Sequence, residues 1–186
     1  SNIQIVKKLK NIAKSENIKI NNDGLTAIAV SADGALRDAE VALSKVIATC
    51  DRKKEILVDE VYSILGLVPF SYYPEFVGLL ASKDRDGALS FVNNIYSNGI
   101  NLDQFTSGLV GYFRKILIHT INPAILASVG EDLLDNDVEL VTEYSQVLNQ
   151  EQLTRMLNIF VSAKEGIKSS PIPQLPLELA VLDLIG

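Results

Sequence analysis

The sequence predicts an all-α fold, and three kinds of observation support this. Apolar residues recur at the three- and four-residue spacing of a helical face along most of the chain. Sustained two-residue alternation, the mark of a half-buried strand, is rare. Residues that begin and end helices, chiefly Asn, Asp and Gly, follow one another at short intervals. Together these signals indicate about ten or eleven helices.

The first third of the chain contains four expected helices. An amphipathic helix precedes Glu16, and Asp23 is a candidate cap for a helix that runs through Ala32. Asp33-Gly34 ends that helix and opens the next. A short helix begins near Val58 and ends at Gly66. The third of these helices places its apolar residues on one face: Leu36, Ala39, Leu43, Val46 and Ile47.

The helices expected farther along have clear cap signals. One starts near Pro74, and Asp84 is a candidate cap for another that reaches Tyr96 and stops at Asn98-Gly99. Two later helices begin with an Asn followed by a Gln three residues on, a looser form of the capping box. These pairs are Asn101 with Gln104 and Asn149 with Gln152. Each of the two helices carries an apolar face: Leu102, Phe105, Leu109, Phe113 and Ile116 in one, and Leu153, Leu157, Phe160, Ile167 and the stem of Lys164 in the other.

The last element is the one place where a strand competes with a helix. Leu175, Leu177, Leu179 and Val181 alternate with other residues. We favour a buried helix here, because Pro176 fits its first turn and apolar residues surround the helix axis. Pro171 and Pro173 mark the loop before it.

One domain boundary is predicted. Residues 66–71 follow a short helix and precede the helix near Pro74. The boundary divides a small helical bundle, residues 1–67, from a larger helical body, residues 68–186, and both fall within ordinary domain sizes.

Composition narrows the classes of function. The chain has 186 residues, 47% hydrophobic and 22% charged, and a net charge of −6. A chain with this composition can fold around a core, and its acidic balance is a poor fit to gripping DNA phosphates. No long run of basic residues stands out, so we expect little direct DNA binding.

Three observations bear on the cellular location of the chain and on whether it is a fragment. No apolar run approaches the ~20 residues of a membrane span, so we expect no membrane partner. The single cysteine excludes an intrachain disulfide, which fits the cytoplasm. The chain begins with Ser1-Asn2 rather than Met, so we expect a fragment of a longer protein.

Catalytic patterns are sparse, and no metal site is predicted. No Gly is followed by Lys, so no P-loop is present and the chain alone is not expected to be an enzyme. His119 is the only histidine and lies in an apolar run, which favours a structural role. Cys50 is expected to be a partly buried inert thiol, although Lys53 and Lys54 could lower its pKa. The acidic stretch 131–137 lacks the central glycine and the terminal glutamate of a calcium-binding EF-hand loop.

The most informative segment is residues 31–39. Gly34 lets the chain turn, a new helix starts, and Arg37 falls in its first turn. Arg37 is one residue past Leu36, so it points about 100° away from the packing face. A guanidinium held outward on a rigid element suits a bidentate grip on phosphate or carboxylate oxygens. The simpler alternative is a surface arginine paired with Asp38 or Glu40.

This segment resembles the G-S-x-R-D-A motif in the lid of bacterial clamp-loader ATPases, the gamma/tau subunits of DNA polymerase III. Ala35 stands at the serine position, and Leu43-Ser44-Lys45 stands where the family has L-D-Q. The resemblance continues in order through residues 58–67 and through a body with Gly99, Asp103, Phe105 and Leu109 to Arg114. It ends at residues 173–182, which are similar to a P-x-L-x-L-E-x-A-x-L helix.

The resemblance implies a fold, partners and a role. Residues 1–67 would be the helical lid and residues 68–186 the collar of an ATPase whose P-loop domain precedes them. Arg37 would sense the nucleotide phosphates, supported by Gly34, Asp38 and Ala39, with ATP and Mg bound only in the full-length protein. That protein would be an ATPase subunit of a nucleotidyltransferase holoenzyme in DNA replication. The collar would bind other clamp-loader subunits, and the ATPase domain would contact the sliding clamp and primed DNA.

Two other functions stay open at this stage. The chain could belong to a related subunit of the delta-prime kind, which does not hydrolyse ATP. It could also be an all-α adaptor that binds partner helices in a groove and has no link to a nucleotide.

Overall fold

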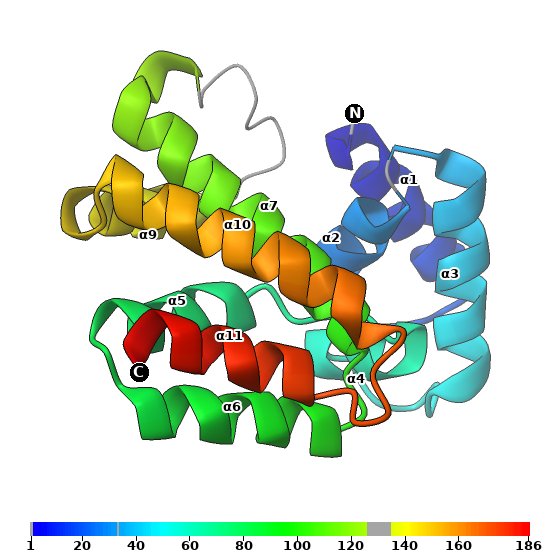
Figure 1. Ribbon diagram of the computed structural model, residues 1–186. Coiled ribbons are helices and arrows are strands. Elements are labelled where there is room, and N and C mark those ends of the chain that lie inside the picture. The colour runs from blue at the N-terminus through cyan, green and yellow to red at the C-terminus, as the bar shows by residue number, and fades with distance from the viewer. Residues whose placement is uncertain (1, 33, 126–134) are drawn as a thin grey trace. The chain divides into compact units, whose positions relative to one another are not determined.

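The structure, a computed structural model, describes residues 2–32, 34–125 and 135–186, with side chains of the last range described from residue 138. The all-α prediction is confirmed: ten helices are defined in these ranges, and two short extended segments meet only in an isolated bridge, Ile20 with Ile56. Figure 1 shows their arrangement. The chain divides into two compact units, Ser1–Pro69 and Phe70–Gly186, where the sequence placed the boundary at residue 67.

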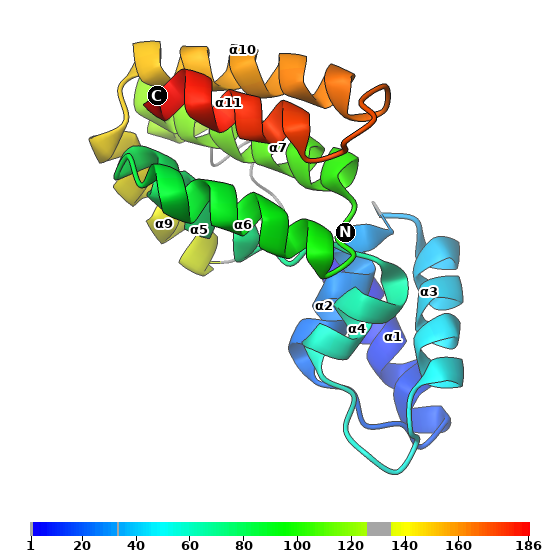
Figure 2. The same cartoon turned by 60° about the horizontal axis from the view of Figure 1, so that its bottom comes forward.

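Unit 1 is a four-helix bundle built around its second helix. The helices are α1 (Asn2–Ser15), α2 (Asn22–Ser31), α3 (Leu36–Thr49) and α4 (Val58–Leu65). Helix α2 packs against each of the other three, as Figure 2 shows. The expected face of α3 is buried at Ala39, Leu43, Val46 and Ile47, with Leu36 partly exposed. Gly66 ends α4 in the left-handed conformation, as predicted.

The two extended segments of unit 1 hold a long loop in place. Residues 19–21 run parallel to residues 55–57, where the Ile56 amide donates to the Lys19 carbonyl at 2.8 Å and the Asn21 amide donates to the Ile56 carbonyl at 3.1 Å. The charged loop 51–55 is thereby fixed beside the end of α1.

Unit 2 is a larger helical body. Its helices are α5 (Tyr72–Ala81), α6 (Arg85–Ser97), α7 (Leu102–Ile121), α9 (Asp135–Val147), α10 (Gln150–Ile167) and α11 (Leu175–Ile185). The two longest, α7 and α10, pack along one another, and α11 lies between α10 and α6 (Figures 1 and 2). Buried aromatic side chains fill the interior: Phe76, Phe91, Phe105, Tyr112, Phe113 and Phe160. They contact one another or the half-buried Tyr73 in pairs.

The predicted caps of unit 2 are confirmed. The side chains of Asp84, Asn101 and Asn149 each accept a backbone N–H three residues on, at 2.9–3.0 Å. The Asn149 amide also donates a hydrogen bond to the Gln152 side chain, which completes a capping box. The final segment is the helix α11 rather than a strand, with Pro in its first turn.

Two predicted helix starts are wrong by one or two residues. The cap of α2 is Asn21, whose side chain accepts from the Gly24 amide at 2.9 Å, and Asp23 falls inside the first turn. The parallel pairing with Ile56 sets this boundary, because it fixes Asn21 in extended backbone. Helix α5 begins at Tyr72, since a proline such as Pro74 is tolerated anywhere in a first turn.

Candidate functional site

The candidate site is the start of α3 in unit 1. Helix α2 ends at Ser31, the Ala35 amide donates to the Ala32 carbonyl at 2.8 Å, and Gly34 adopts φ +79°. That left-handed conformation costs other residues about 1–2 kcal/mol, so glycine suits the turn. Asp33, the other half of the predicted helix break, lies outside the described residues.

Arg37 occupies the second position of α3 and is exposed to solvent. The helix that carries it is anchored by Ala39 and Leu43, which are 0% and 1% exposed. The backbone of Arg37 is thus held rigidly while its side chain is directed outward. The next two residues of the motif differ in the same way: Asp38 is exposed like Arg37, whereas Ala39 is buried.

Within the described ranges, Arg37 makes no hydrogen bond or ion pair. The simpler alternative of a pair with Glu40 is not observed, because the Glu40 carboxylate lies 3.2 Å from the Lys8 ammonium. Asp38 forms no ion pair with Arg37 either. None of the described residues occupies the donors of the guanidinium.

The first turn of α3 also lacks a side-chain cap. Ala35 is the N-cap residue, with φ −88° and ψ 104°, and no side chain accepts a hydrogen bond there. The first N–H groups of a helix have no intrahelical acceptor, and together they carry roughly half a positive charge. Arg37 adds a full positive charge to this end and Asp38 a full negative one, so the attraction for an anion comes from the uncapped N–H groups and the guanidinium donors. In the sequence, Ala35 stands out only as a departure from a motif. An apolar residue at a predicted N-cap is the signal that could have indicated the uncapped helix start.

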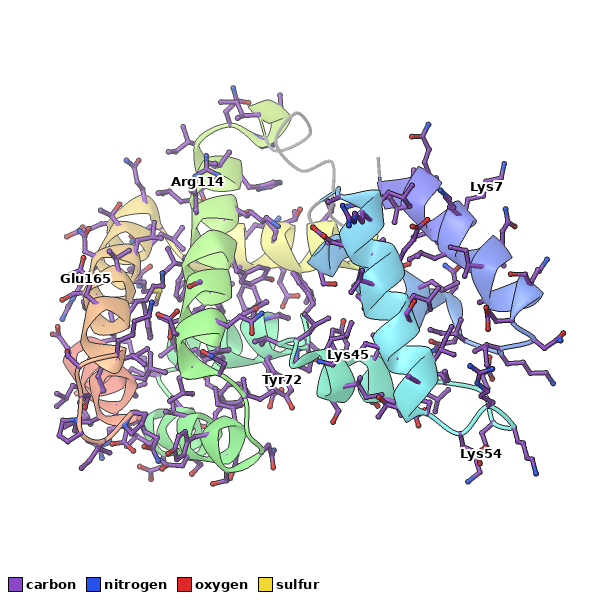
Figure 3. The ribbon with its side chains drawn as sticks, turned by 90° about the vertical axis from the view of Figure 1, so that its right-hand side faces the viewer. Lys7, Lys45, Lys54, Tyr72, Arg114 and Glu165 are labelled. Atoms are coloured by element: carbon purple, nitrogen blue, oxygen red, sulfur yellow. The ribbon has the colours of Figure 1, made fainter. Side chains whose placement is uncertain are left out.

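The other departures from the motif lie on the same helix. The Ser44 hydroxyl donates to the Glu40 carbonyl at 2.8 Å, and Lys45 is exposed. Figure 3 shows the Lys45 side chain on α3. Neither residue meets the start of the helix.

The remaining candidates from the sequence are structural. His119 is half-buried between α7 and α9, with Nδ1 2.9 Å from the Ser145 hydroxyl and Nε2 3.3 Å from that of Thr142. Cys50 is also half-buried. Burial and the Glu60 carboxylate raise the pKa of its thiol, so Lys53 and Lys54 do not activate it.

The described parts of the chain hold neither a metal-ligand cluster nor a membrane-spanning helix. No three His, Cys, Asp or Glu side chains in those ranges gather to hold a metal ion. The acidic stretch 131–137 lies outside the described side chains. None of the described helices is long and apolar enough to cross a membrane.

The collar motif of the sequence analysis is mostly core. Phe105 and Leu109 are fully buried on α7, and Gly99 makes the turn before it at φ +79°. The Asp103 carboxylate lies 3.7 Å from the ammonium of Lys168, the residue just after α10. Arg114 is exposed on α7, as Figure 3 shows.

Comparison with known proteins decides the family. Residues 56–186 match the family described as DNA polymerase III subunits gamma and tau domain III, and residues 4–52 match the ATPase lid domain of the DNA polymerase III clamp loader subunit. The chain belongs to the gamma/tau family. Arg37 and the uncapped turn therefore lie inside a segment with the sequence of a clamp-loader lid.

Individual relatives agree with this family. The tau subunit of DNA polymerase III from Bacillus subtilis is 25% identical over 181 residues, which is 97% of this chain and 31% of that protein. The gamma subunit from Buchnera aphidicola is 22% identical and matches 98% of this chain and 49% of its own length. The chain thus spans about a third to a half of such gamma/tau relatives.

A solved structure shares the fold. The DNA clamp loader delta protein of Bacillus subtilis superposes with a TM-score of 0.58 at 16% identity, over 100% of this chain and 56% of that one. At this level of identity the likeness shows a common fold only.

Proposed function

We propose that this chain is the lid and collar of a gamma/tau-like clamp-loader subunit. In the intact protein, ATP binding and hydrolysis would load the sliding clamp onto primed DNA. The observation that carries the proposal is Arg37, exposed and without a partner in the described ranges, at an uncapped helix start within the lid-like segment. ATP and Mg would be held by a P-loop domain of the full-length protein, and the lid would contribute the guanidinium.

The physical role of Arg37 follows from its electrostatics. Its charge is unfavourable next to the positive end of α3, and a triphosphate would relieve that repulsion. One charge-assisted hydrogen bond is worth about 1.5–3 kcal/mol, which corresponds to a shift of roughly ten- to a hundredfold in a two-state equilibrium. The lid would close only to the extent that Arg37 binds the ATP state better than the empty state.

Unit 2 would supply the collar through which the subunit assembles with other clamp-loader subunits. In its aromatic core the buried side chains Phe76, Phe105 and Phe160 make ring contacts with other aromatic residues of unit 2. A body that packs internally in this way can present a fixed surface to neighbouring subunits.

The test uses the full-length protein assembled with its partner subunits. Arg37→Ala should slow ATP-dependent clamp loading by about ten- to a hundredfold, and Arg37→Lys, which keeps the charge but loses the planar fork, should fall between it and the native protein. Arg85→Ala is the control, because Arg85 is also an exposed arginine at the start of a helix, α6 of unit 2, where it lies 3.8 Å from Asp86. Equal loading rates in the Arg37→Ala and Arg85→Ala proteins would contradict the proposal.

A second candidate is a delta-prime-like subunit that binds its partners but does not hydrolyse ATP. Ala35, Ser44 and Lys45 favour it, because these positions depart from the motif of the hydrolysing family. ATP turnover by the isolated full-length protein separates the two. An adaptor without any nucleotide would instead show identical hydrogen exchange at residues 34–38 with and without ATP.

A further inference from the structure

The charges of this chain are unevenly divided. Unit 1 contains ten of the 17 Lys and Arg residues and nine of the 23 Asp and Glu residues, so its net charge is +1. Unit 2 has seven basic and 14 acidic residues and a net charge of −7. The net charge of −6 for the whole chain therefore reflects unit 2, and it hides the slightly positive net charge of unit 1.

Helix α1 is the most basic element of unit 1. It carries four lysines and no acidic residue. Lys8 lies 3.2 Å from Glu40 of α3 and is neutralised by it. The other three, Lys7, Lys10 and Lys14, are exposed and form no ion pair within the described ranges.

These three lysines lie in one stripe. At 100° per residue they fall within an arc of about 60°, directed away from the face that buries Ile5 and Leu9. Their rises along the axis are about 4.5 Å between Lys7 and Lys10 and about 6 Å between Lys10 and Lys14. Because Lys7, Lys10 and Lys14 are three and four residues apart, these three lysines do not form a consecutive run in the sequence.

A loop far away in sequence extends the stripe. Arg52 lies 3.9 Å from Glu16, just beyond the end of α1, so the loop cations Arg52, Lys53 and Lys54 are placed at that end. The carboxylate of Asp51 accepts the Lys53 amide at 3.0 Å and is directed into its own loop. Figure 3 shows Lys7 on α1 and Lys54 in this loop, both extending away from the bundle.

The chemistry of this surface selects a phosphate backbone as its ligand. Phosphates along one strand of a duplex are spaced at about 3.4 Å per base pair, so flexible lysine stems at these rises can reach successive phosphates. A protein partner is a poorer fit, because lysine is depleted from the cores of protein interfaces and aromatic residues are enriched there. The stripe is lysine-rich and contains no aromatic side chain.

We propose that Lys7, Lys10 and Lys14, continued by Lys53 and Lys54, form a sequence-independent binding surface for the phosphate backbone of double-stranded nucleic acid. This differs from the expectation, drawn from the total charge, that the chain contributes little direct DNA binding. It stands apart from the nucleotide role of Arg37, so the failure of one leaves the other intact.

The experiment titrates the 186-residue chain into a fluorescent duplex of random sequence and measures anisotropy at several salt concentrations. Each phosphate contact contributes a slope of about −0.9 to log K against log salt. Three lysine contacts alone then weaken binding about 40-fold between 50 and 200 mM salt.

The decisive variant is the triple substitution Lys7→Gln, Lys10→Gln and Lys14→Gln, which keeps helix propensity because Lys and Gln are similar. It should reduce the magnitude of the slope by about 2.7 and weaken binding at 50 mM salt by about tenfold or more. The matched control removes three exposed lysines elsewhere, Lys45→Gln, Lys83→Gln and Lys168→Gln, and so makes the same change in net charge. Circular dichroism checks that both variants fold.

Three results would overturn the proposal. One is native chain that shows no salt-dependent binding to the duplex. A second is a control variant that loses as much affinity and slope as the α1 variant. The third is competition by polyglutamate as effective as competition by unlabelled duplex at equal charge concentration, which would assign the surface to an acidic protein.

Discussion

The uncapped start of α3 gives a prediction that can be worked out in detail. Ala35→Ser places a hydroxyl at the N-cap, where the backbone already has the extended conformation that capping residues use, φ −88° and ψ 104°. No rearrangement is needed for the hydroxyl oxygen to accept the Asp38 N–H, the third amide of the helix. A serine cap in place of alanine is worth about 0.5–2 kcal/mol, typically about 1.

That gain should appear in unit 1, which contains α3. In a bundle of this size, 1 kcal/mol corresponds to a rise in Tm of about 4–8 °C. Native-state hydrogen exchange gives the free energy of opening of the amides in α1–α4 directly. We expect it to rise in Ala35→Ser, and the amides of α7 and α10 to keep their values.

The matched control is Ala48→Ser, the same substitution at an exposed position in the last turn of α3. Serine is the poorer helix former, so this variant should lose up to about 0.5 kcal/mol. If Ala35→Ser behaves like Ala48→Ser, the first turn of α3 is capped by another group and the electrostatic argument for Arg37 loses its basis.

The remaining predictions concern a glycine pair, the core and the thiol. Gly34→Ala should destabilise unit 1 by about 1–2 kcal/mol, because Gly34 has a positive φ. Gly111→Ala, in α7 with open space for a Cβ, should instead stabilise unit 2 by about 0.5–1 kcal/mol. Urea unfolding measures the free energy of both variants, and equal effects would refute the conformational argument. Phe105→Ala should cost about 3–5 kcal/mol because the ring is fully buried, while Arg155→Ala, at an exposed ion pair with Asp183, should cost no more than about 1 kcal/mol in the same assay. Because burial and Glu60 raise the pKa of Cys50, iodoacetamide should label the folded chain slowly, and Glu60→Gln should speed the labelling; an unchanged rate would contradict the contribution of Glu60. The folded state holds the thiol proton more tightly than the unfolded state, so this group contributes stability below the unfolded pKa, and that contribution falls as pH rises toward the folded value.

The sequence predicted what depends on local periodicity and capping. The faces of α3 and α7 and the caps at Asn101 and Asn149 follow from spacing alone, and each is observed. The start of α2 could not be predicted in this way, because the pairing of residues 19–21 with residues 55–57 is a contact between segments far apart in sequence.

The candidate site was likewise predictable only where it depends on local sequence. The position of Arg37 in a first turn followed from the sequence. That it has no partner among the described residues did not, since Lys8 of a different helix engages Glu40. The basic stripe of α1 was missed for two reasons. Its lysines are not consecutive, and the loop that extends it is placed by Arg52 and Glu16 across the bundle.

The most direct test of the account is the affinity of the full-length protein for ATP in the native, Arg37→Lys and Arg37→Ala forms. A contact between the Arg37 guanidinium and the phosphates predicts that Arg37→Ala raises the dissociation constant about ten- to a hundredfold, with Arg37→Lys between the two. A dissociation constant that is the same in all three proteins would contradict it.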